Sequence, residues 1–530
     1  MDSIQRREIS FATPKGIIGK NKDSKQNHLN NENEELKNQI KNEKDSRIKK
    51  ILEKIDSSKD HYEIIVLSSE LIGINPEDHY GYLRKAISLH KLKQEDKAEQ
   101  SFKEAMKKTN NTSDVDVPYS AYLIDLGKMD EAFELCNKII SLDQKNMFAW
   151  HNKGIIFNAR KEYEKAIECC NRALEIDSNS KETVINKAQN LEELGEYEKA
   201  IECCNRGLEI DEKYEHAWWN KGNALRGVKE YEKAIECYDR VLDIDEKDVQ
   251  AWYDKAYALT DLEQYEKAIE CCNRGLEIDK TDYRLWDTKG YALNSLEQYE
   301  KAIECYNRAL DIDEKQSSGW TNKGHSLVQL EQYEKAIECC NRGLEIDEKN
   351  VHAWNNKGNA LRGVKEYEKA IECYNKGLEI DEKNVHMESR LWANKAAVLM
   401  DQDESEKAIE CCNRALDIDE KNVNAWNNKG HSLAKLEQYE KAIECLKKSL
   451  SIENNNEVRE AISNLIEKQK EDISSKSNNN DKPSWYNDPA SYAQKSYIEK
   501  LGGNPNSVKT KGEASEMITK LKENKQNQSK

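Results

Sequence analysis

The chain has 530 residues and a formal net charge of -17, with 35% charged residues, 37% hydrophobic residues and only 6 prolines. So much charge with so few helix breakers favours long helical structure over a β-sandwich or a collagen-like chain. No stretch approaches the ~20 apolar residues needed to cross a bilayer, and the N-terminus lacks the apolar core of a secretory signal. Length alone suggests about three or four domains.

The first part of the chain is polar and then weakly repetitive. Residues 1–44 are rich in Asn, Lys, Glu and Ser and poor in apolar residues. We therefore expect a mostly disordered N-terminal tail, with a helix beginning near Glu34. Weak repeat units occupy residues 45–146: a degenerate one begins at Asp45, and two more begin at His79 and Ser113.

A 34-residue period dominates the middle of the chain. The string YEKAIE begins at Tyr163 and recurs every 34 residues as far as Tyr367, and a further copy begins at Tyr439. A tryptophan follows the same period in eight of the nine strong units, and we number each unit so that this tryptophan is position 4. Residues 385–388 are then a four-residue insertion, and residues 45–456 hold about twelve units. The strong units, over 147–456, begin at Met147, Lys181, Glu215, Val249, Tyr283, Ser317, Val351, Ser389 and Val423.

Each strong unit predicts two helices. Apolar or small residues recur at positions 4, 8 and 11 of the first helix (helix A) and at positions 20, 21, 24 and 28 of the second (helix B), which is helical spacing. Position 8 is Gly or Ala and position 20 is Ala in every strong unit. Small residues at these positions let helices A and B approach closely, and the segment IDEKN supplies the turn.

A 34-residue helix–turn–helix with Trp at position 4, Gly at 8, Ala at 20 and a bulky residue near 24 resembles the tetratricopeptide repeat (TPR) family. The resemblance covers nearly four-fifths of the chain. It implies an all-α fold, a right-handed superhelical solenoid whose concave groove is lined mainly by helix A. Position 7 departs from the family, being Lys where the family favours Leu, and position 32 is polar rather than Pro except at Pro76. We expect the position 7 stem to lie along apolar surface with its head in water.

The C-terminal part changes in composition. Residues 457–471 predict the polar-backed capping helix that a stack of repeats needs, and residues 472–486 predict a polar linker. Residues 487–524 predict a helix–loop–helix, with Asp488 as N-cap and Pro489 at the first helical position. This segment resembles a small prokaryotic helix–loop–helix module of unknown function, and we expect a disordered tail over 525–530. The expected core of the module is Tyr497, Ile498, Leu501, Val508, Ala514, Met517, Ile518 and Leu521.

All 15 cysteines fall on positions 23 and 24 of the repeat. Equivalent residues in stacked units lie roughly 10 Å apart, whereas a disulfide needs Cα atoms within about 7 Å and a zinc site needs four converging ligands. We therefore interpret cysteine as a small buried hydrophobe copied by duplication. No metal and no cofactor is expected, and free thiols in such number indicate a reducing cytoplasm.

Some helix A positions differ strongly between otherwise similar units. In the TPR family the groove is lined by positions 2, 5, 6, 9, 12 and 13, and here positions 2, 5, 9, 12 and 13 are among the least uniform. Such variation is what recognition produces, although neutral drift at solvent-facing sites predicts it equally well. The candidate specificity residues are Trp219, Tyr253, Tyr257, Tyr291, His325 and His431.

Position 6 is asparagine in most strong units, with a break at Asp254 and Thr288. An amide offers a donor and an acceptor, so a ladder of them can hold a peptide backbone without reading its sequence. The ladder resembles one in the TPR superhelix of a protein glycosyltransferase, although Asn at this position is also common in generic repeats of the family. The candidate peptide-binding residues are Asn152, Asn186, Asn220, Asn322, Asn356, Asn394 and Asn428.

Charge and motifs together favour a binding protein. The chain has no P-loop, no GxGxxG, no HExxH and no GxSxG, so we expect no enzyme and name no catalytic residue. Residues 1–44 carry a net charge of +2, residues 484–530 carry +3, and the remainder carries -22. An acidic solenoid repels nucleic acid and favours a basic or neutral protein or peptide partner. The sequence predicts a cytoplasmic interaction scaffold; the alternative is an adaptor whose C-terminal module contacts DNA or RNA.

Overall fold

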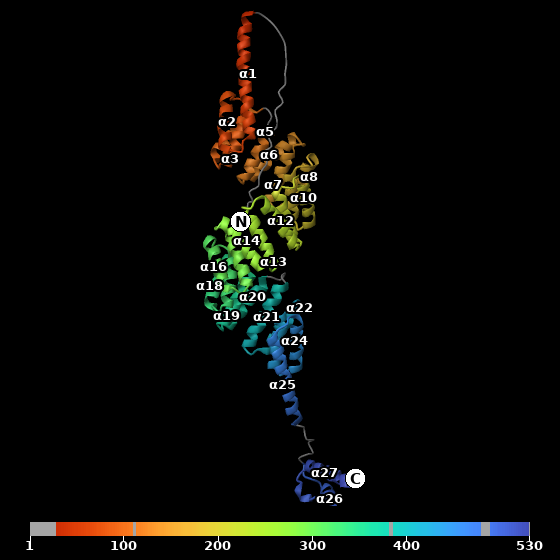
Figure 1. The fold of residues 1–530 in the computed structure, drawn as a ribbon. Coiled ribbons are helices and arrows are strands. Elements are labelled where there is room, and N and C mark those ends of the chain that lie inside the picture. Colours follow the sequence, from red (N-terminus) through yellow and green to blue (C-terminus); the bar gives the residue numbers. More distant parts are fainter. Residues whose placement is uncertain (1–27, 110–112, 381–384, 479–487, 529–530) are drawn as a thin grey trace. The chain divides into compact units, whose positions relative to one another are not determined.

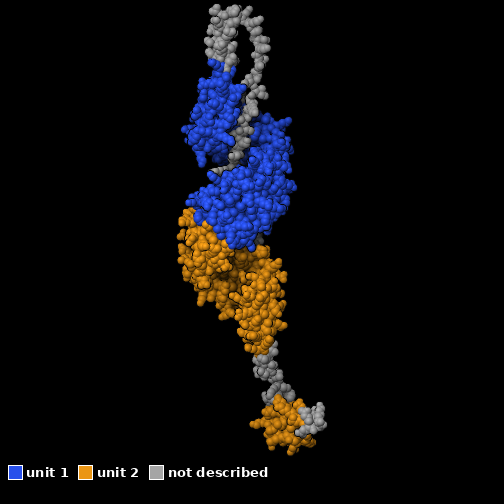
Figure 2. Space-filling view, viewed as in Figure 1, with its two compact units in different colours: residues 1–288 blue, residues 289–530 orange. Residues whose placement is uncertain are grey.

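The computed structural model describes residues 28–109, 113–380, 385–478 and 488–528, and these residues are almost entirely helical (Figure 1). They form 27 α-helices and one 3₁₀ helix, and within these ranges no strand occurs. The predicted all-α fold of repeated helix–turn–helix units is confirmed. The chain divides into two compact units, 1–288 and 289–530, which are coloured separately in Figure 2 and described in turn.

The first compact unit contains the weak repeats and the first strong ones. Each repeat contributes a helix A and a helix B that pack against each other, and each helix B between residues 61 and 244 packs against the next helix A. Its helices are α1 (His28–Ser57), α2 (His61–Ile74), α3 (His79–Lys91), α4 (Glu95–Lys108), α5 (Ser113–Asp125), α6 (Met129–Leu142), α7 (Met147–Ala159), α8 (Tyr163–Ile176), α9 (Lys181–Glu193), α10 (Tyr197–Ile210), α11 (Glu215–Gly227), α12 (Tyr231–Ile244), α13 (Val249–Asp261) and α14 (Tyr265–Ile278).

The second compact unit begins within α15 (Tyr283–Ser295). It continues the pairing of helices A and B, and then α25 packs on α24 where the repeats end. Its helices are α16 (Tyr299–Ile312), α17 (Ser317–Gln329), α18 (Tyr333–Ile346), α19 (Val351–Gly363), α20 (Tyr367–Ile380), α21 (Val385–Asp401), α22 (Ser405–Ile418), α23 (Val423–Lys435), α24 (Tyr439–Ile452), α25 (Asn456–Asn478), α26 (Tyr492–Lys500), η1 (Pro505–Ser507) and α27 (Lys511–Gln528).

Two local devices set the helix boundaries. In several units the last residue of the preceding turn caps helix A, as where the Asn350 side chain accepts a hydrogen bond from the Ala353 backbone N–H at 3.1 Å. Between helices A and B, position 15 adopts a left-handed conformation, with φ of +74° at Gly127 and +75° at Gly195. Most other units place Lys, Glu or Asp there, for example Glu331 with φ of +56°. A non-glycine residue in this conformation is strained by about 1–2 kcal/mol.

Positions 8 and 24 face each other where helices A and B cross, and their sizes are matched. A Cβ added at Gly358 would lie 2.5 Å from a ring carbon of the fully buried Tyr374. A Cβ added at Gly154 would lie 3.4 Å from the sulfur of Cys170, which is ordinary contact. In the strong units, alanine at position 8 occurs only where position 24 is cysteine, and a Tyr or Leu at position 24 is always paired with glycine.

In seven strong units the tryptophan at position 4 joins the unit to the turn before it. Its indole N–H donates to the carbonyl of the residue six positions earlier, which is position 32 of the preceding unit, as in Trp320 to Glu314 at 2.9 Å. The lysine at position 7 lies over the same ring, for example Lys323 with its Nζ 5.1 Å from the Trp320 ring centroid. Equivalent tryptophan hydrogen bonds form at Trp150, Trp218, Trp252, Trp286, Trp354 and Trp426.

The insertion 385–388 lengthens a helix A rather than forming a loop. Helix α21 has 17 residues where the equivalent α19 has 13, so the four extra residues add about one turn. Within that turn, Met387 is buried in the cluster that holds Tyr374 and Leu391.

The chain ends depart from expectation in several places. Helix α1 begins at His28 rather than near Glu34, and α25 continues to Asn478 through the start of the predicted linker. No proline or glycine interrupts either helix, so nothing stops it at the expected residue. Helix α27 continues to Gln528, through most of the tail predicted as disordered over 525–530. Most of the predicted N-terminal tail (1–27), residues 479–486 of the linker, residue 487 and the last two residues lie outside the described residues.

The start of the C-terminal module was predicted wrongly. Helix α26 is N-capped by Ser491 rather than Asp488, because Ser491 and Gln494 form a capping box. Pro489 instead forms an isolated bridge with Thr510. Of the expected core, Ile498, Val508 and Ala514 are buried and pack with Met517, Ile518 and Leu521, whereas Tyr497 is 42% exposed.

All 15 cysteines are free thiols, and only Cys203 is not buried. Burial raises the pKa of the Cys136 thiol to about 12 and that of the Cys237 thiol to about 11, for example. The residues that the structure describes contain no cluster of His, Cys, Asp or Glu able to hold a metal ion. None of their helices combines the length and the apolar character required for crossing a bilayer.

Candidate functional site

Helices A of successive repeats are neighbours within each compact unit. In the first unit α7 contacts α9 and α9 contacts α11, and in the second unit α17, α19, α21 and α23 follow one another in the same way. Side chains at equivalent helix A positions therefore form rows from one repeat to the next. Most of the candidate residues identified from the sequence lie on these rows.

The asparagines of position 6 mostly donate to the preceding repeat. The Asn356 amide donates to the Thr321 carbonyl at 3.2 Å, and the Asn428 amide donates to the Ala393 carbonyl at 2.9 Å. Asn394 donates to the Asn355 side chain at 2.8 Å. Similar bonds link Asn152 with Ser120 at 2.9 Å and Asn186 with His151 at 3.3 Å, whereas Asn220 donates within its own helix to His216 at 2.6 Å. These bonds hold neighbouring helices A together.

The break in the asparagine ladder keeps an inter-repeat hydrogen bond and reverses its direction. Asp254 is buried and accepts from the indole N–H of Trp219, at position 5 of the preceding repeat, at 2.7 Å. The Gln250 amide donates to the same carboxylate oxygen at 2.9 Å. Because Trp219 supplies a donor where other repeats supply an acceptor, a carboxylate at position 6 satisfies it. Thr288, the second residue of the break, is also buried.

Two arginines surround Asp254 and lie over the candidate tyrosines. The guanidinium of Arg226 lies 3.8 Å from the Asp254 carboxylate and 5.0 Å from the Tyr257 ring centroid. Arg284 lies 4.7 Å from the Tyr253 ring centroid and pairs with Asp282 at 2.6 Å. Three residues predicted from the sequence, Trp219, Tyr253 and Tyr257, are thus brought together in one polar and aromatic cluster.

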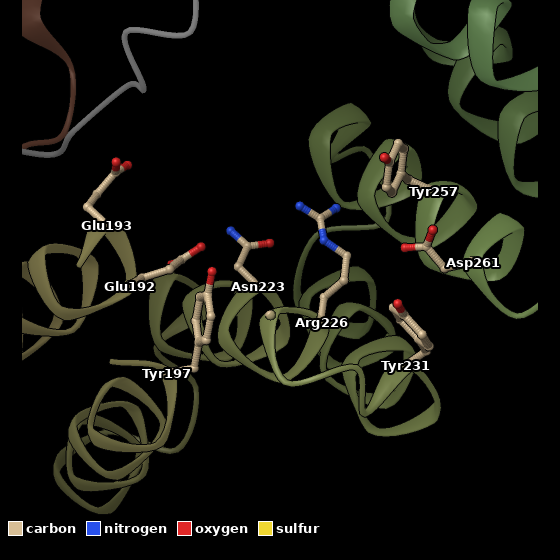
Figure 3. A pocket seen from close by; sticks show the side chains of 9 residues that line it. Glu192, Glu193, Tyr197, Asn223, Arg226, Tyr231, Tyr257 and Asp261 are labelled. Atoms are coloured by element: carbon tan, nitrogen blue, oxygen red, sulfur yellow. The ribbon is translucent and has the colours of Figure 1, made fainter. Parts of the chain in front are cut away.

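A pocket of about 480 Å³ opens beside this cluster (Figure 3). Carboxylates line it from α9 and α13, namely Glu192, Glu193 and Asp261. Aromatic rings line it at Tyr197, Tyr231 and Tyr257. Its floor is formed by α11, with Asn223, Arg226 and Gly227. The helix A residues among them occupy positions 9, 12 and 13, which are groove positions in the TPR family.

Burial has a large effect on the acids of this pocket. Partial burial raises the pKa of the Glu192 carboxyl to about 7, with Arg226 opposing the rise and Glu193 and Asp254 adding to it. Burial also raises the pKa of Asp261, again against the charge of Arg226. Glu192 is therefore about half protonated near neutral pH, and a nearby positive charge would lower its pKa.

The other candidate residues lie in the second compact unit. Tyr291 is 46% exposed. His325 is half-buried with its Nδ1 3.4 Å from the Asn294 side chain, and burial lowers its pKa. His431 is exposed by its accessible surface, and desolvation nonetheless lowers its pKa. No other candidate groove residue shares the pocket of the first unit with Tyr257.

Sequence reasoning missed the charged residues of the pocket. Arg226, Glu192 and Asp261 stand at positions 12 and 13, which were recognised as groove positions, but no residue there was singled out. Because 35% of the residues in this chain are charged, a single charged side chain does not stand out as a candidate site residue. The variation at position 12, from Glu to Arg to Thr in three successive repeats, marks the position as variable but does not identify which of its residues line a pocket.

The fold and this row of variable positions define a solenoid of helix–turn–helix repeats. The family model of the tetratricopeptide repeat matches residues 217–248, 249–282, 288–316, 317–350, 351–384, 389–422 and 423–456. The model of the C-terminal ARM domain of tetratricopeptide repeat protein 21 matches residues 25–216. The chain belongs to the tetratricopeptide repeat family. Its repeats form a scaffold of the general kind that supports protein–protein interaction.

Several solved structures are similar to this chain at low identity. The Cut9–Hcn1 hetero-tetramer of the APC/C shares 13% identity over 76% of this chain and 93% of that chain, with a TM-score of 0.44. YrrB, described as a TPR protein with an unusual peptide-binding site, shares 22% identity over 35% of this chain and 96% of that chain, with a TM-score of 0.30. MamA shares 21% identity over 32% and 92%, with a TM-score of 0.29. No curated protein matches the chain.

Proposed function

We propose that this chain binds segments of partner proteins along its rows of helix A side chains, without catalysing a reaction. The observation that carries the proposal is the pocket of about 480 Å³, which is lined by helix A positions that differ between repeats. Its volume and its mixture of aromatic and polar walls suit a side chain of a bound segment. The scaffold beneath it, in contrast, is nearly the same in every strong repeat.

Exposed aromatic side chains support the same proposal. Tyr257 and Tyr291 stand at position 9 of consecutive repeats and are 42% and 46% exposed. Tyrosine supplies a large contact area at a low entropic cost, and it is enriched in protein interfaces. The acidic charge of the repeats favours a partner segment that is basic or neutral.

The asparagine ladder makes a smaller, separate contribution to the proposal. Asn356 and Asn394 already donate to the preceding repeat, and the Asn356 oxygen accepts from the Asn355 amide at 3.4 Å, so a bound peptide would compete with the contacts that join the repeats. The triple substitution of Asn322, Asn356 and Asn394 by alanine tests this contribution. Unchanged affinity for a bound peptide would reject the ladder as a binding element, and a loss of stability alone would assign it to repeat packing.

A random peptide library displayed on phage and selected on the full chain tests the main proposal. We expect enriched peptides whose affinity falls by about tenfold, or about 1.4 kcal/mol, in Tyr257→Ala. Glu209→Gln, an exposed change on helix B, is the matched control and leaves affinity unchanged. Failure to enrich any peptide, or binding that ignores Tyr257→Ala, would contradict the proposal.

A second candidate function concerns the C-terminal module. Tyr492 is 89% exposed, Tyr497 is 42% exposed with the Lys522 amine 5.3 Å from its ring centroid, and residues 484–530 carry a charge of +3. Exposed rings beside lysines are features of single-stranded nucleic-acid binding. Filter binding of the full chain at two salt concentrations tests it, with Lys500, Lys509 and Lys520 changed to Glu. Absent or salt-independent retention would reject this function.

A further inference from the structure

We propose that the pocket between α9, α11 and α13 binds a cationic side chain, lysine or arginine, of the bound protein segment. This inference rests on the proposed function, because it names the chemistry that one part of the same surface recognises. It concerns only the first compact unit, where all the residues involved are described.

The charges of the pocket do not balance within the protein. Its one cation, Arg226, already faces the buried Asp254 at 3.8 Å and lies over Tyr257. Among the described residues, neither Glu192 nor Asp261 forms an ion pair within 4.0 Å. The lining therefore presents more carboxylate than the protein itself neutralises, and an incoming cation would find unpaired acceptors.

The third carboxylate is engaged only by a neutral group. Glu193 accepts a hydrogen bond from the Tyr163 hydroxyl at 3.1 Å, which leaves its negative charge uncompensated. Figure 3 shows Glu192 and Glu193 together at one end of the pocket, with Arg226 between them and Tyr257. A cation bound at the Glu192 end therefore meets two carboxylates and lies on the side away from Asp261.

Aromatic rings give this end of the pocket its shape. The Tyr197 ring packs directly on Gly227, where any added Cβ would collide with it. Glycine at this position of α11 thus makes room for the ring beside Glu192. A lysine or arginine side chain lying along a tyrosine buries its methylenes and places its charge near the ring, which is a favourable cation–π arrangement.

An anionic ligand is disfavoured by the same geometry. To reach Arg226, an anion would have to compete with Asp254 for the guanidinium. It would also be repelled by the negative charges of Glu192 and Asp261. A bare metal ion is also disfavoured, because no group of three metal-ligating side chains is present in the parts of the chain that the structure describes.

The raised pKa of Glu192, about 7, makes binding depend on pH. The ionised carboxylate attracts the cation and the protonated form does not, so affinity rises as pH increases through about 7. The groups that act on Glu192 are Arg226 of α11, Asp254 of α13, Tyr238 of α12, Cys204 of α10 and Glu193 of its own helix. Of these, burial raises the pKa of Cys204 and of Tyr238 well above neutral, so their charges do not change near pH 7.

The test uses peptides from the random library selected on the full chain. For each peptide the basic residues are replaced one at a time by norleucine, which keeps the methylenes and removes the charge. Affinities are measured by fluorescence anisotropy at about pH 6 and about pH 8, for the unmodified chain, for Glu192→Gln and for the control Glu209→Gln. Circular dichroism confirms that each variant keeps its helical content.

We expect norleucine at one position and Glu192→Gln each to weaken binding by about tenfold, with no further loss when the two are combined. Glu192→Gln also removes the rise in affinity between the two pH values, and Glu209→Gln changes nothing. This inference would be overturned if Glu192→Gln and the norleucine substitutions left peptide affinity unchanged while Tyr257→Ala lowered it. The proposed function would then still stand. If no peptide binds, both are overturned.

Discussion

The matched pair at positions 8 and 24 gives the sharpest prediction about stability. We compare Gly154→Ala, which faces Cys170, with Gly358→Ala, which faces Tyr374. Both glycines lie inside a helix A, so alanine gains about 1 kcal/mol of helix propensity in each. At Gly154 the new Cβ meets its nearest neighbours at 3.4 Å, which is ordinary contact. We therefore expect Gly154→Ala to stabilise the chain.

At Gly358 the new Cβ would lie 2.5 Å from the ring of Tyr374. That ring is fully buried, and its hydroxyl donates to the Asn359 side chain at 2.8 Å, so it has no free space to move into. Overpacking of this kind destabilises by about 1–3 kcal/mol, which exceeds or cancels the gain in propensity. The two variants should therefore differ by about 2 kcal/mol in the free energy of unfolding, with Gly154→Ala more stable than the unmodified chain and Gly358→Ala no more stable than it.

Urea unfolding of the full chain, followed by circular dichroism, measures the difference. A cycle with Tyr374→Cys supplies the control, because the pair of alanine and cysteine occurs naturally at Ala188 and Cys204. Gly358→Ala should be less harmful in the presence of Tyr374→Cys, which gives a favourable coupling energy of about 1–3 kcal/mol. Equal effects of the two glycine substitutions, or no coupling in the cycle, would refute the packing argument.

Three further predictions concern other parts of the repeats. Hydrogen bonds to Asp125 and to a second carboxylate raise the pKa of His90. The contribution of His90 to stability is therefore full below about pH 6.5 and is lost as pH rises through the raised pKa. The thermal midpoint of His90→Gln should lie further below that of the unmodified chain at acidic pH than at alkaline pH. Glu331→Gly should stabilise by up to about 1 kcal/mol, because φ is +56° there, and an unchanged or lower thermal midpoint would count against strain at that turn. A thiol reagent should react rapidly with Cys203 at most, since the other 14 cysteines are buried; rapid reaction of several thiols before unfolding would contradict the packing of helix B.

The repeat fold was predictable because the same 34-residue pattern recurs in nine strong units, so every unit supports the same helix–turn–helix interpretation. Trp219, Tyr253 and Tyr257 were found because they are large aromatic residues at positions 5 and 9, which vary between repeats. Arg226 and Glu192 were not, because their importance depends on being partly buried beside each other, and burial within a groove has no periodic signature.

The asparagine ladder shows a different limit. Its asparagines recur at position 6 of helix A, but the partners of Asn356 and Asn428 are backbone carbonyls of the preceding repeat, and no residue type reveals a backbone partner. The match of positions 8 and 24 was visible in the sequence as a correlation of sizes. Only the structure shows that the two positions touch, which turns the correlation into a packing rule.

The tryptophan at position 4 bears on how such a chain can change in length. Its hydrogen bond reaches back six residues, so its partner is defined by counting along the chain rather than by a distant contact. If residues 317–350 were removed, Trp354 would stand where Trp320 now stands, with Glu314 six residues before it. Losing or gaining a whole unit therefore keeps the tryptophan hydrogen bond between the units on either side of the change. A deletion or insertion of another length within the turn would change which residue lies six positions before the tryptophan. The number of copies is free to vary over generations while the way that neighbours meet stays constant.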